Sequence, residues 1–119
     1  MPSIDPKVIA DLRALEEGGS PGFLAELIDL FLKEEPQYRA RLRDALARRD
    51  AALLERAAHT LKGSGGNLGA KELSGLASRL QDVARAANWA EAALLLEKIE
   101  TEAAAVEKEL LAEKLRGRQ

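Results

Sequence analysis

The chain holds a single histidine, His59, within the stretch AHTLKGSGG from Ala58 to Gly66. An imidazole in water is largely neutral at neutral pH, and its free ring nitrogen can attack phosphorus to form a phosphoramidate. The phosphoryl group would add about −1.5 to −2 charges if it resembles other phosphorylated side chains. Lys62, one helical turn beyond the histidine, could offset that charge. This stretch is therefore compatible with a histidine that accepts a phosphoryl group, and the alternative, an idle surface histidine, stays open.

The spacing of apolar residues predicts that this histidine faces water. Each residue advances about 100° around a helix, so Leu61 and Gly65 fall within roughly 40° of Leu54 on the buried side. His59 falls at about 140° from Leu54, and Gly63 falls at about 180°. Glycine in a helix costs about 0.5–1 kcal/mol relative to alanine. A glycine on the water-facing side therefore suggests that another molecule approaches the backbone there.

The composition limits the class of protein. The chain has 119 residues, of which 46% are hydrophobic and only 3% aromatic, so we expect one domain with an aliphatic core. The absence of cysteine excludes disulfides and thiolate metal sites and is typical of a reducing compartment. No apolar run approaches the ~20 residues of a membrane span, and the first residues lack the pattern of a signal peptide. We therefore expect a cytoplasmic protein with no membrane segment.

Periodic apolar residues predict five helices and no strand. Residues that typically begin helices are found at Asp5-Pro6, Ser20-Pro21, Asp50, and Asn88 with Glu91. The first helix is short and ends at Gly18-Gly19, and a turn at residues 67–70 precedes the fourth helix. Pro36 lies inside the second helix and predicts a kink or, alternatively, a break into two helices.

Short connections make consecutive helices antiparallel neighbours. The predicted fold class is therefore all-α, an antiparallel up-down four-helix bundle with a short additional N-terminal helix. We expect a single domain over residues 1–119. Residues 1–19 would form the short helix and its turn, residues 20–115 the bundle, and residues 116–119 a frayed tail. Because the bundle closes its own core, we also expect a monomer.

Residues 58–81, AHTLKGSGGNLGAKELSGLASRLQ, closely resemble the core of histidine-containing phosphotransfer (HPt) domains. The shared pattern is A-H-x-L-K-G-S/A, then a turn with Leu-Gly, then a helix that ends in Leu-Glu or Leu-Gln. The matching residues are His59, Leu61, Lys62, Gly63, Ser64, Leu68, Gly69, Leu80 and Gln81. The order and lengths of the predicted helices resemble this family over most of the remaining chain.

The resemblance implies a phosphoryl carrier rather than a complete enzyme. His59 would be phosphorylated, Lys62 would lie beside the phosphoryl group, and Gln81 would hydrogen-bond the histidine ring and orient it. The spacing agrees, because Gln81 lies about 80° from Leu73, at the edge of the buried stripe of its helix. The implied partners are the receiver domain of a response regulator, a hybrid sensor histidine kinase, or both. The receiver would supply the aspartate and Mg²⁺, so no cofactor is expected in this chain.

The resemblance also implies a docking surface around the histidine. Gly63 would let the receiver's loops pack against the helix. Gly66 lies on the same side, although it could serve only to prepare the end of the helix. Ser64 could assist near the histidine or pack between helices, and both alternatives stay open.

Other parts of the chain carry weaker signals. On the first helix, Ile9, Leu12 and Leu15 are candidate docking residues, although Leu12 and Leu15 are expected instead to cap the core. Acidic neighbours dilute the basic stretch from Arg39 to Arg49, and the net charge is −2, so we expect no nucleic-acid partner. One histidine without cysteine makes no metal site. The competing interpretation is a helical-bundle interaction module that binds a signalling partner without carrying phosphate.

Overall fold

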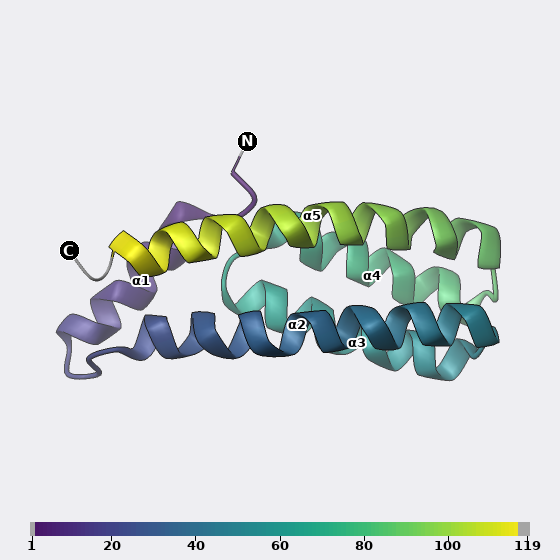
Figure 1. The fold of residues 1–119 in the computed structure, drawn as a ribbon, viewed down its shortest axis with the longest axis horizontal. Helices are drawn as coiled ribbons and strands as arrows, with labels where there is room; N and C mark the ends of the chain where they lie inside the picture. Colours follow the sequence, from purple (N-terminus) through teal and green to yellow (C-terminus); the bar gives the residue numbers. More distant parts are fainter. Residues whose placement is uncertain (1, 117–119) are drawn as a thin grey trace.

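The computed structural model describes residues 2–116, which form five helices and no strand. The helices are α1 (Pro6–Glu17), α2 (Phe23–Arg48), α3 (Ala51–Asn67), α4 (Lys71–Arg85) and α5 (Trp89–Arg116) (Figure 1). The predicted all-α bundle with a short additional N-terminal helix is confirmed. Of the tail that was expected to fray, Arg116 is helical, and residues 117–119 lie outside the described range. No helix in that range combines the length and apolar character needed to span a bilayer.

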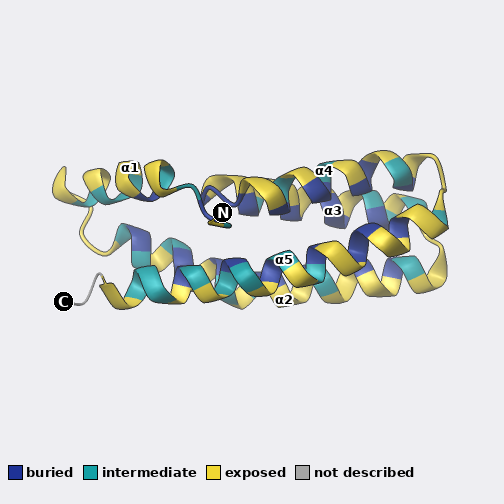
Figure 2. Cartoon of the chain, turned by 90° about the horizontal axis from the view of Figure 1, so that it is seen from above, coloured by how far each residue is buried: buried dark blue, intermediate teal, exposed yellow. Residues whose placement is uncertain are grey.

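The helices differ in length, and this difference determines the shape of the bundle. α2 and α5 have 26 and 28 residues, whereas α3 and α4 have only 17 and 15. The α3–α4 pair therefore covers only part of the long helices. α1, with 12 residues, lies beside the part that remains (Figure 2). At about 1.5 Å per residue, α5 alone accounts for most of the 46 Å long axis.

The start of α1 is joined to the turn between α3 and α4. The backbone N–H of Asp5 donates to the carbonyl of Gly69 at 2.9 Å, and Lys71 pairs with the Asp5 carboxylate at 2.8 Å. Gly69 has a φ of 80°, and a Cβ here would lie 2.8 Å from the Cβ of Val8. Only glycine fits both this conformation and this contact, so Gly69 lets α1 close the end of the bundle.

Three of the helices begin at the predicted cap residues. The side chains of Asp5, Asp50 and Asn88 each accept a backbone N–H of the first helical turn, at 2.9, 3.0 and 3.2 Å. Each bond satisfies a donor that has no partner within the helix. These three predicted helix starts are therefore confirmed.

The predicted start of the second helix at Ser20-Pro21 is wrong, because α2 begins at Phe23. Its N-cap is Gly22, which has a left-handed φ of 78° and offers no capping side chain. The N–H of Leu24 instead donates to the carboxylate of Glu16 at the end of α1, at 2.8 Å. A side chain from the preceding helix thus replaces the local cap that the sequence suggested.

Pro36 lies within α2, which runs without interruption from Phe23 to Arg48. The alternative in which the chain breaks there into two helices is therefore wrong. A proline removes one backbone donor and crowds the preceding turn. Buried apolar side chains on both sides of the proline hold the helix against the core, namely Leu24, Ile28, Phe31, Tyr38, Leu42 and Ala45.

The core is aliphatic, as the composition predicted, with one acidic exception. Its largest fully buried apolar side chains are Ile28, Leu42, Leu54, Leu61, Leu73, Leu80, Leu95, Ile99, Val106 and Leu110. Glu35 of α2 is also fully buried, with Oε1 2.5 Å from Nε of Arg39. Burial and the nearby Glu107 carboxylate of α5 raise the pKa of Glu35 to about 8. The Glu35 carboxyl is therefore largely protonated at neutral pH.

The basic stretch of α2 is largely paired within the bundle. Arg39 reaches Glu107 of α5 at 3.3 Å, and Arg43 reaches Glu100 of α5 at 2.7 Å. These ion pairs join the two long helices along their length. These two arginines therefore contribute to the α2–α5 seam.

Candidate functional site

His59 lies near the middle of α3, and its side chain is exposed. The buried residues of the same helix are Leu54, Ala57, Ala58, Leu61 and Gly65. They face the core because apolar residues recur with the helical period. The same period turns His59 outward, so the direction that the sequence predicted for this histidine is confirmed.

Gln81 of α4 meets the histidine ring across the α3–α4 seam. Its Nε2 atom lies 3.2 Å from Nδ1 of His59, although the two residues are 22 positions apart. Only 7% of Gln81 is exposed, because it lies at the edge of the buried stripe that contains Leu80 and Ala84. A side chain fixed by packing therefore holds the ring by its inner nitrogen.

This contact determines which ring nitrogen is free to react. In a neutral imidazole one nitrogen carries a proton and the other carries a lone pair. The glutamine amide can present its carbonyl oxygen in place of its NH₂ group by a half-turn about its last bond. When Gln81 Oε1 accepts the proton of Nδ1, Nε2 of His59 keeps its lone pair. The ring is then a nucleophile at the nitrogen that Gln81 does not engage.

Lys62 brings a positive charge to the same face of α3. Its side chain is exposed, three residues after His59, which places the two side chains on neighbouring positions of the helix surface. Its backbone carbonyl accepts a hydrogen bond from the Ser74 hydroxyl of α4 at 2.9 Å. The Ser74 hydroxyl thus ties the backbone of Lys62 to α4. The side chain of Lys62 can offset negative charge on a phosphorylated His59.

Two exposed glycines leave the backbone beside His59 bare. A Cβ at Gly63 would meet no other heavy atom within 4 Å. A Cβ at Gly66 would make only an ordinary contact, 3.6 Å from Oγ of Ser74. Gly65, in contrast, is buried against Ala70. Packing within the chain therefore does not require glycine at positions 63 and 66, and the bare backbone there is accessible to another molecule.

Ser64 lies on the side of α3 that faces α2, and its two possible roles, packing between helices and assistance near the histidine, stay predictions. It is half-buried and borders a shallow groove of about 60 Å³ between α2 and α3. The groove is lined by Leu27, Leu30, Phe31, Glu34, Ser64, Asn67 and Leu68. Leu30 is 52% exposed, so the edge of this groove presents an apolar side chain on the side of α3 that faces α2.

An ion pair that was not predicted from the sequence joins α3 and α4 one turn from His59 and Gln81. Nε of Arg85 lies 2.7 Å from Oε1 of Glu55. Glu55 is four residues before His59, and Arg85 is four residues after Gln81, so this pair forms the next cross-helix contact of the same seam. The four-residue spacing on both helices was the signal that could have found it. Glu55 also raises the pKa of Arg85, so a guanidinium cation stays close to the site.

The predicted docking role of Ile9 is wrong, because its side chain does not reach the surface. Its side chain is buried, with 5% exposed, because α1 covers the end of α2 and α5 and turns this residue toward the core. Leu12 packs against the core, as expected. Leu15 was also expected to cap the core, and this expectation is wrong because 54% of it is exposed.

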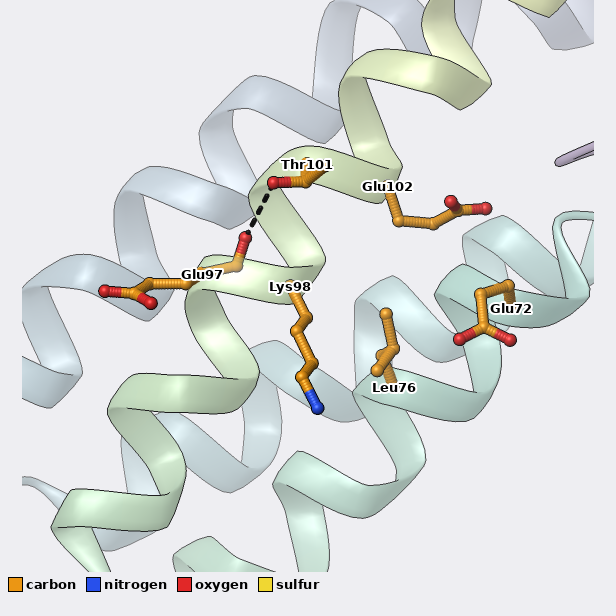
Figure 3. A pocket seen from close by; sticks show the side chains of 6 residues that line it. All are labelled: Glu72, Leu76, Glu97, Lys98, Thr101 and Glu102. Carbon is orange, nitrogen blue, oxygen red and sulfur yellow. Dashed lines mark hydrogen bonds between the residues drawn. The ribbon is translucent and has the colours of Figure 1, made fainter.

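A separate hollow of about 380 Å³ lies between α4 and α5 (Figure 3). It is lined by Glu72, Leu76, Glu97, Lys98, Thr101 and Glu102, and His59 is not part of it. In the part of the chain that the structure describes, no group of three or more histidine, cysteine or acidic side chains is placed to hold a metal ion. The exposed histidine and this acidic hollow belong to different seams of the bundle.

Comparisons with known proteins identify the family of the chain. The Hpt domain model matches residues 26–109. The chain is similar to the crystal structure of histidine-containing phosphotransfer protein B (HptB) from Pseudomonas aeruginosa PAO1, with 31% identity and a TM-score of 0.85 over 97% of this chain and 96% of that chain. It shares its fold with the phosphotransfer protein ZmHP2 from maize, with 24% identity and a TM-score of 0.86 over 98% and 85% of the two chains. A comparison with curated protein sequences gives no match.

Proposed function

Because the chain belongs to the Hpt domain family and is a histidine-containing phosphotransfer protein of a phosphorelay, we propose that His59 is the residue that carries the phosphoryl group. The observation that carries this proposal is the contact of the buried Gln81 with Nδ1 of an exposed ring. Hpt proteins are phosphoryl shuttles, and they relay the group to and from receiver domains and hybrid kinases.

The reaction begins with Nε2 of His59 and the phosphorus of an aspartyl phosphate on a receiver domain. As the N–P bond forms, the P–O bond to the aspartate breaks and the carboxylate leaves. The ring keeps its Nδ1 proton, and the carbonyl oxygen of Gln81 stabilises the positive charge that develops on the ring. Attack by a second aspartate on the phosphohistidine reverses these steps and passes the group on.

Besides the reactive nitrogen, the transfer step needs aligned reacting atoms and positive charge near the phosphoryl group. Phosphoryl transfer depends mainly on alignment of the reacting atoms and on stabilisation of the charge on the phosphoryl oxygens. Lys62 supplies one such positive charge from this chain. The receiver supplies the aspartate and Mg²⁺, so the carrier needs no cofactor of its own.

We place the docking surface on the outer side of α3. The bare backbone at Gly63 and Gly66 lets the receiver's loops come close to His59. The apolar groove beside Ser64 and the exposed Leu30 extend this surface toward α2. The partner is the receiver domain of a response regulator or of a hybrid sensor histidine kinase. The monomeric state and the cytoplasmic location stay predictions from the sequence.

The test is phosphoryl acceptance from a panel of phosphorylated receiver domains. The wild-type chain should take up an acid-labile, base-stable label, and the His59→Ala variant should take up none while remaining helical by circular dichroism. A folded wild-type chain that accepts no label from any receiver would favour the competing interpretation, an interaction module that carries no phosphate.

A further inference from the structure

The half of α3 that follows His59 is rich in residues that weaken helices. Gly63, Gly65 and Gly66 fall within four consecutive positions. Each glycine gains more backbone freedom on unfolding than alanine does. Nevertheless α3 continues through all three glycines to Asn67. Contacts from outside the helix must therefore help to hold this segment, and Lys62 lies at its beginning.

Ser74 of α4 supplies a specific contact of this kind. Its hydroxyl donates to the carbonyl oxygen of Lys62 at 2.9 Å. In an α-helix the same carbonyl also accepts the N–H of Gly66, and a carbonyl oxygen has lone pairs for both bonds. Oγ of Ser74 also lies close to Gly66, 3.6 Å from the place where a Cβ would be. The hydroxyl thus bonds to the start of the glycine-rich turn and lies near its end.

We propose that Ser74 is a positioning residue of the phosphotransfer site, whose hydroxyl holds the Lys62 carbonyl and keeps the glycine-rich turn of α3 in register with His59. This inference rests on the proposed roles of His59 and Lys62. Ser74 touches neither the phosphoryl group nor the receiver and acts only through the backbone of α3. Small displacements of a charge-stabilising group lower the rate of transfer, even when the partner still binds.

The test compares Ser74→Ala with Ser74→Thr and with Ser78→Ala. Ser78 is one turn further along the same side of α4, is also half-buried, and makes no side-chain hydrogen bond within residues 2–116. The donor is a receiver domain that phosphorylates the wild-type chain and is itself charged with acetyl phosphate. Two quantities are measured, namely the dependence of the transfer rate on receiver concentration and the hydrogen exchange of the backbone amides at residues 63–67.

In Ser74→Ala the amide of Gly66 should exchange about five- to tenfold faster, as expected for the loss of one hydrogen bond. The maximal transfer rate should fall several-fold, while the receiver concentration at half-maximal rate stays unchanged. Ser74→Thr should restore both values, and Ser78→Ala should alter neither.

Three results would overturn the inference. One is a wild-type maximal rate in Ser74→Ala, even with faster exchange, because the hydroxyl would then be only structural. Another is an equal fall in Ser78→Ala, which would indicate a general disturbance of α4. The third is unchanged exchange at Gly66. A wild-type chain that accepts no phosphoryl group would instead reject the proposed function of His59, so the two failures are distinguishable.

Discussion

Gln81 and His59 face each other across the α3–α4 seam, with Nε2 of the glutamine 3.2 Å from Nδ1 of the histidine. Gln81 is buried and His59 is exposed, so a glutamine that is fixed by packing holds the reactive histidine. The contact occupies the inner ring nitrogen and leaves the outer one without a partner from Gln81. The orientation of the ring should therefore depend on α4, whereas its accessibility depends on α3.

Gln81→Ala should slow phosphoryl acceptance about tenfold, because the ring loses the partner that fixes its orientation and its proton. The same change should lower the free energy of unfolding by only about 1 kcal/mol. Gln81→Glu should keep most of the rate, since a carboxylate also accepts the Nδ1 proton. Transfer rates at saturating receiver and urea unfolding curves measure the two effects.

Asp50→Ala is the matched control for stability. This change removes the N-cap of α3 and should cost about 0.5–2 kcal/mol, because the Asp50 carboxylate accepts the N–H of Leu53 at 3.0 Å. Transfer through His59, more than two turns further along the helix, should stay at the wild-type rate. If both variants slow transfer in proportion to their instability, Gln81 is a packing residue and has no role in orienting the ring.

Gly63→Leu should block transfer from a receiver while the bundle stays folded. A Cβ at position 63 would meet no other heavy atom within 4 Å, so we expect the obstruction to arise in the complex. Gly63→Ala should raise the free energy of unfolding by about 0.5–1 kcal/mol, and its smaller side chain should obstruct less. Receiver binding and transfer rate are measured for both variants.

Gly75 offers a comparison for this test. It is also exposed, lies within α4, and a Cβ there would likewise meet nothing within 4 Å. Gly75→Leu should leave transfer close to the wild-type rate. Unchanged transfer in Gly63→Leu would remove the argument that the receiver docks against the bare backbone of α3.

Lys62→Met should lower the transfer rate about tenfold, because the phosphoryl oxygens lose one nearby positive charge. The lysine is exposed, so the free energy of unfolding should change by less than about 0.5 kcal/mol. Lys62→Arg keeps the charge and should retain part of the rate. A Lys62→Met variant with wild-type kinetics over a range of salt concentrations would show that the ammonium group plays no part in transfer.

Stability should fall as the pH rises, because of Glu35. Its pKa in the folded chain is about 8, raised from an ordinary 4.5 by burial and by the carboxylate of Glu107. Between these two values the folded state binds more protons than the unfolded state, so the stabilisation is complete below about pH 4.5 and is lost as the pH rises through about 8. Arg39, the cation beside Glu35, lowers this pKa and so reduces the loss of stability.

Urea unfolding at several pH values measures this dependence. Glu35→Gln should flatten the curve between pH 5 and pH 9, because the amide resembles the protonated acid and does not titrate. A wild-type curve that is already flat in this range, or one that rises toward alkaline pH, would show that Glu35 is ionised inside the bundle.

Much of the fold could be predicted because the signals are local. Asp50 caps α3 through a backbone N–H only three residues away, and the apolar period of α3 alone directs His59 outward. The start of α2 could not be predicted in this way. There the capping group is the carboxylate of Glu16 on another helix, so the cap exists only after α1 and α2 have packed together.

The site shows the same division between local and long-range information. The apolar stripe placed Gln81 only at the edge of the buried face of α4, and the family resemblance paired it with His59. Whether Ile9 faces the core or a partner depends on how the short α3–α4 pair leaves space for α1. Ser74 gave no signal, since its partner is a backbone carbonyl of the neighbouring helix. Glu35 did give one, because it lies four residues after Phe31 and seven before Leu42 on the buried stripe of α2.

The most direct test of the account is to identify the nitrogen that carries the phosphoryl group. The ¹⁵N-labelled chain is phosphorylated by a charged receiver domain, and ¹H–¹⁵N and ³¹P NMR spectra are recorded before and after the reaction. We predict a phosphoryl group on Nε2 of His59, together with a shift of the side-chain amide signals of Gln81. A phosphoryl group on Nδ1, or on any residue other than His59, would contradict the assignment of Gln81 as the partner that holds the inner nitrogen and leaves the outer one to react.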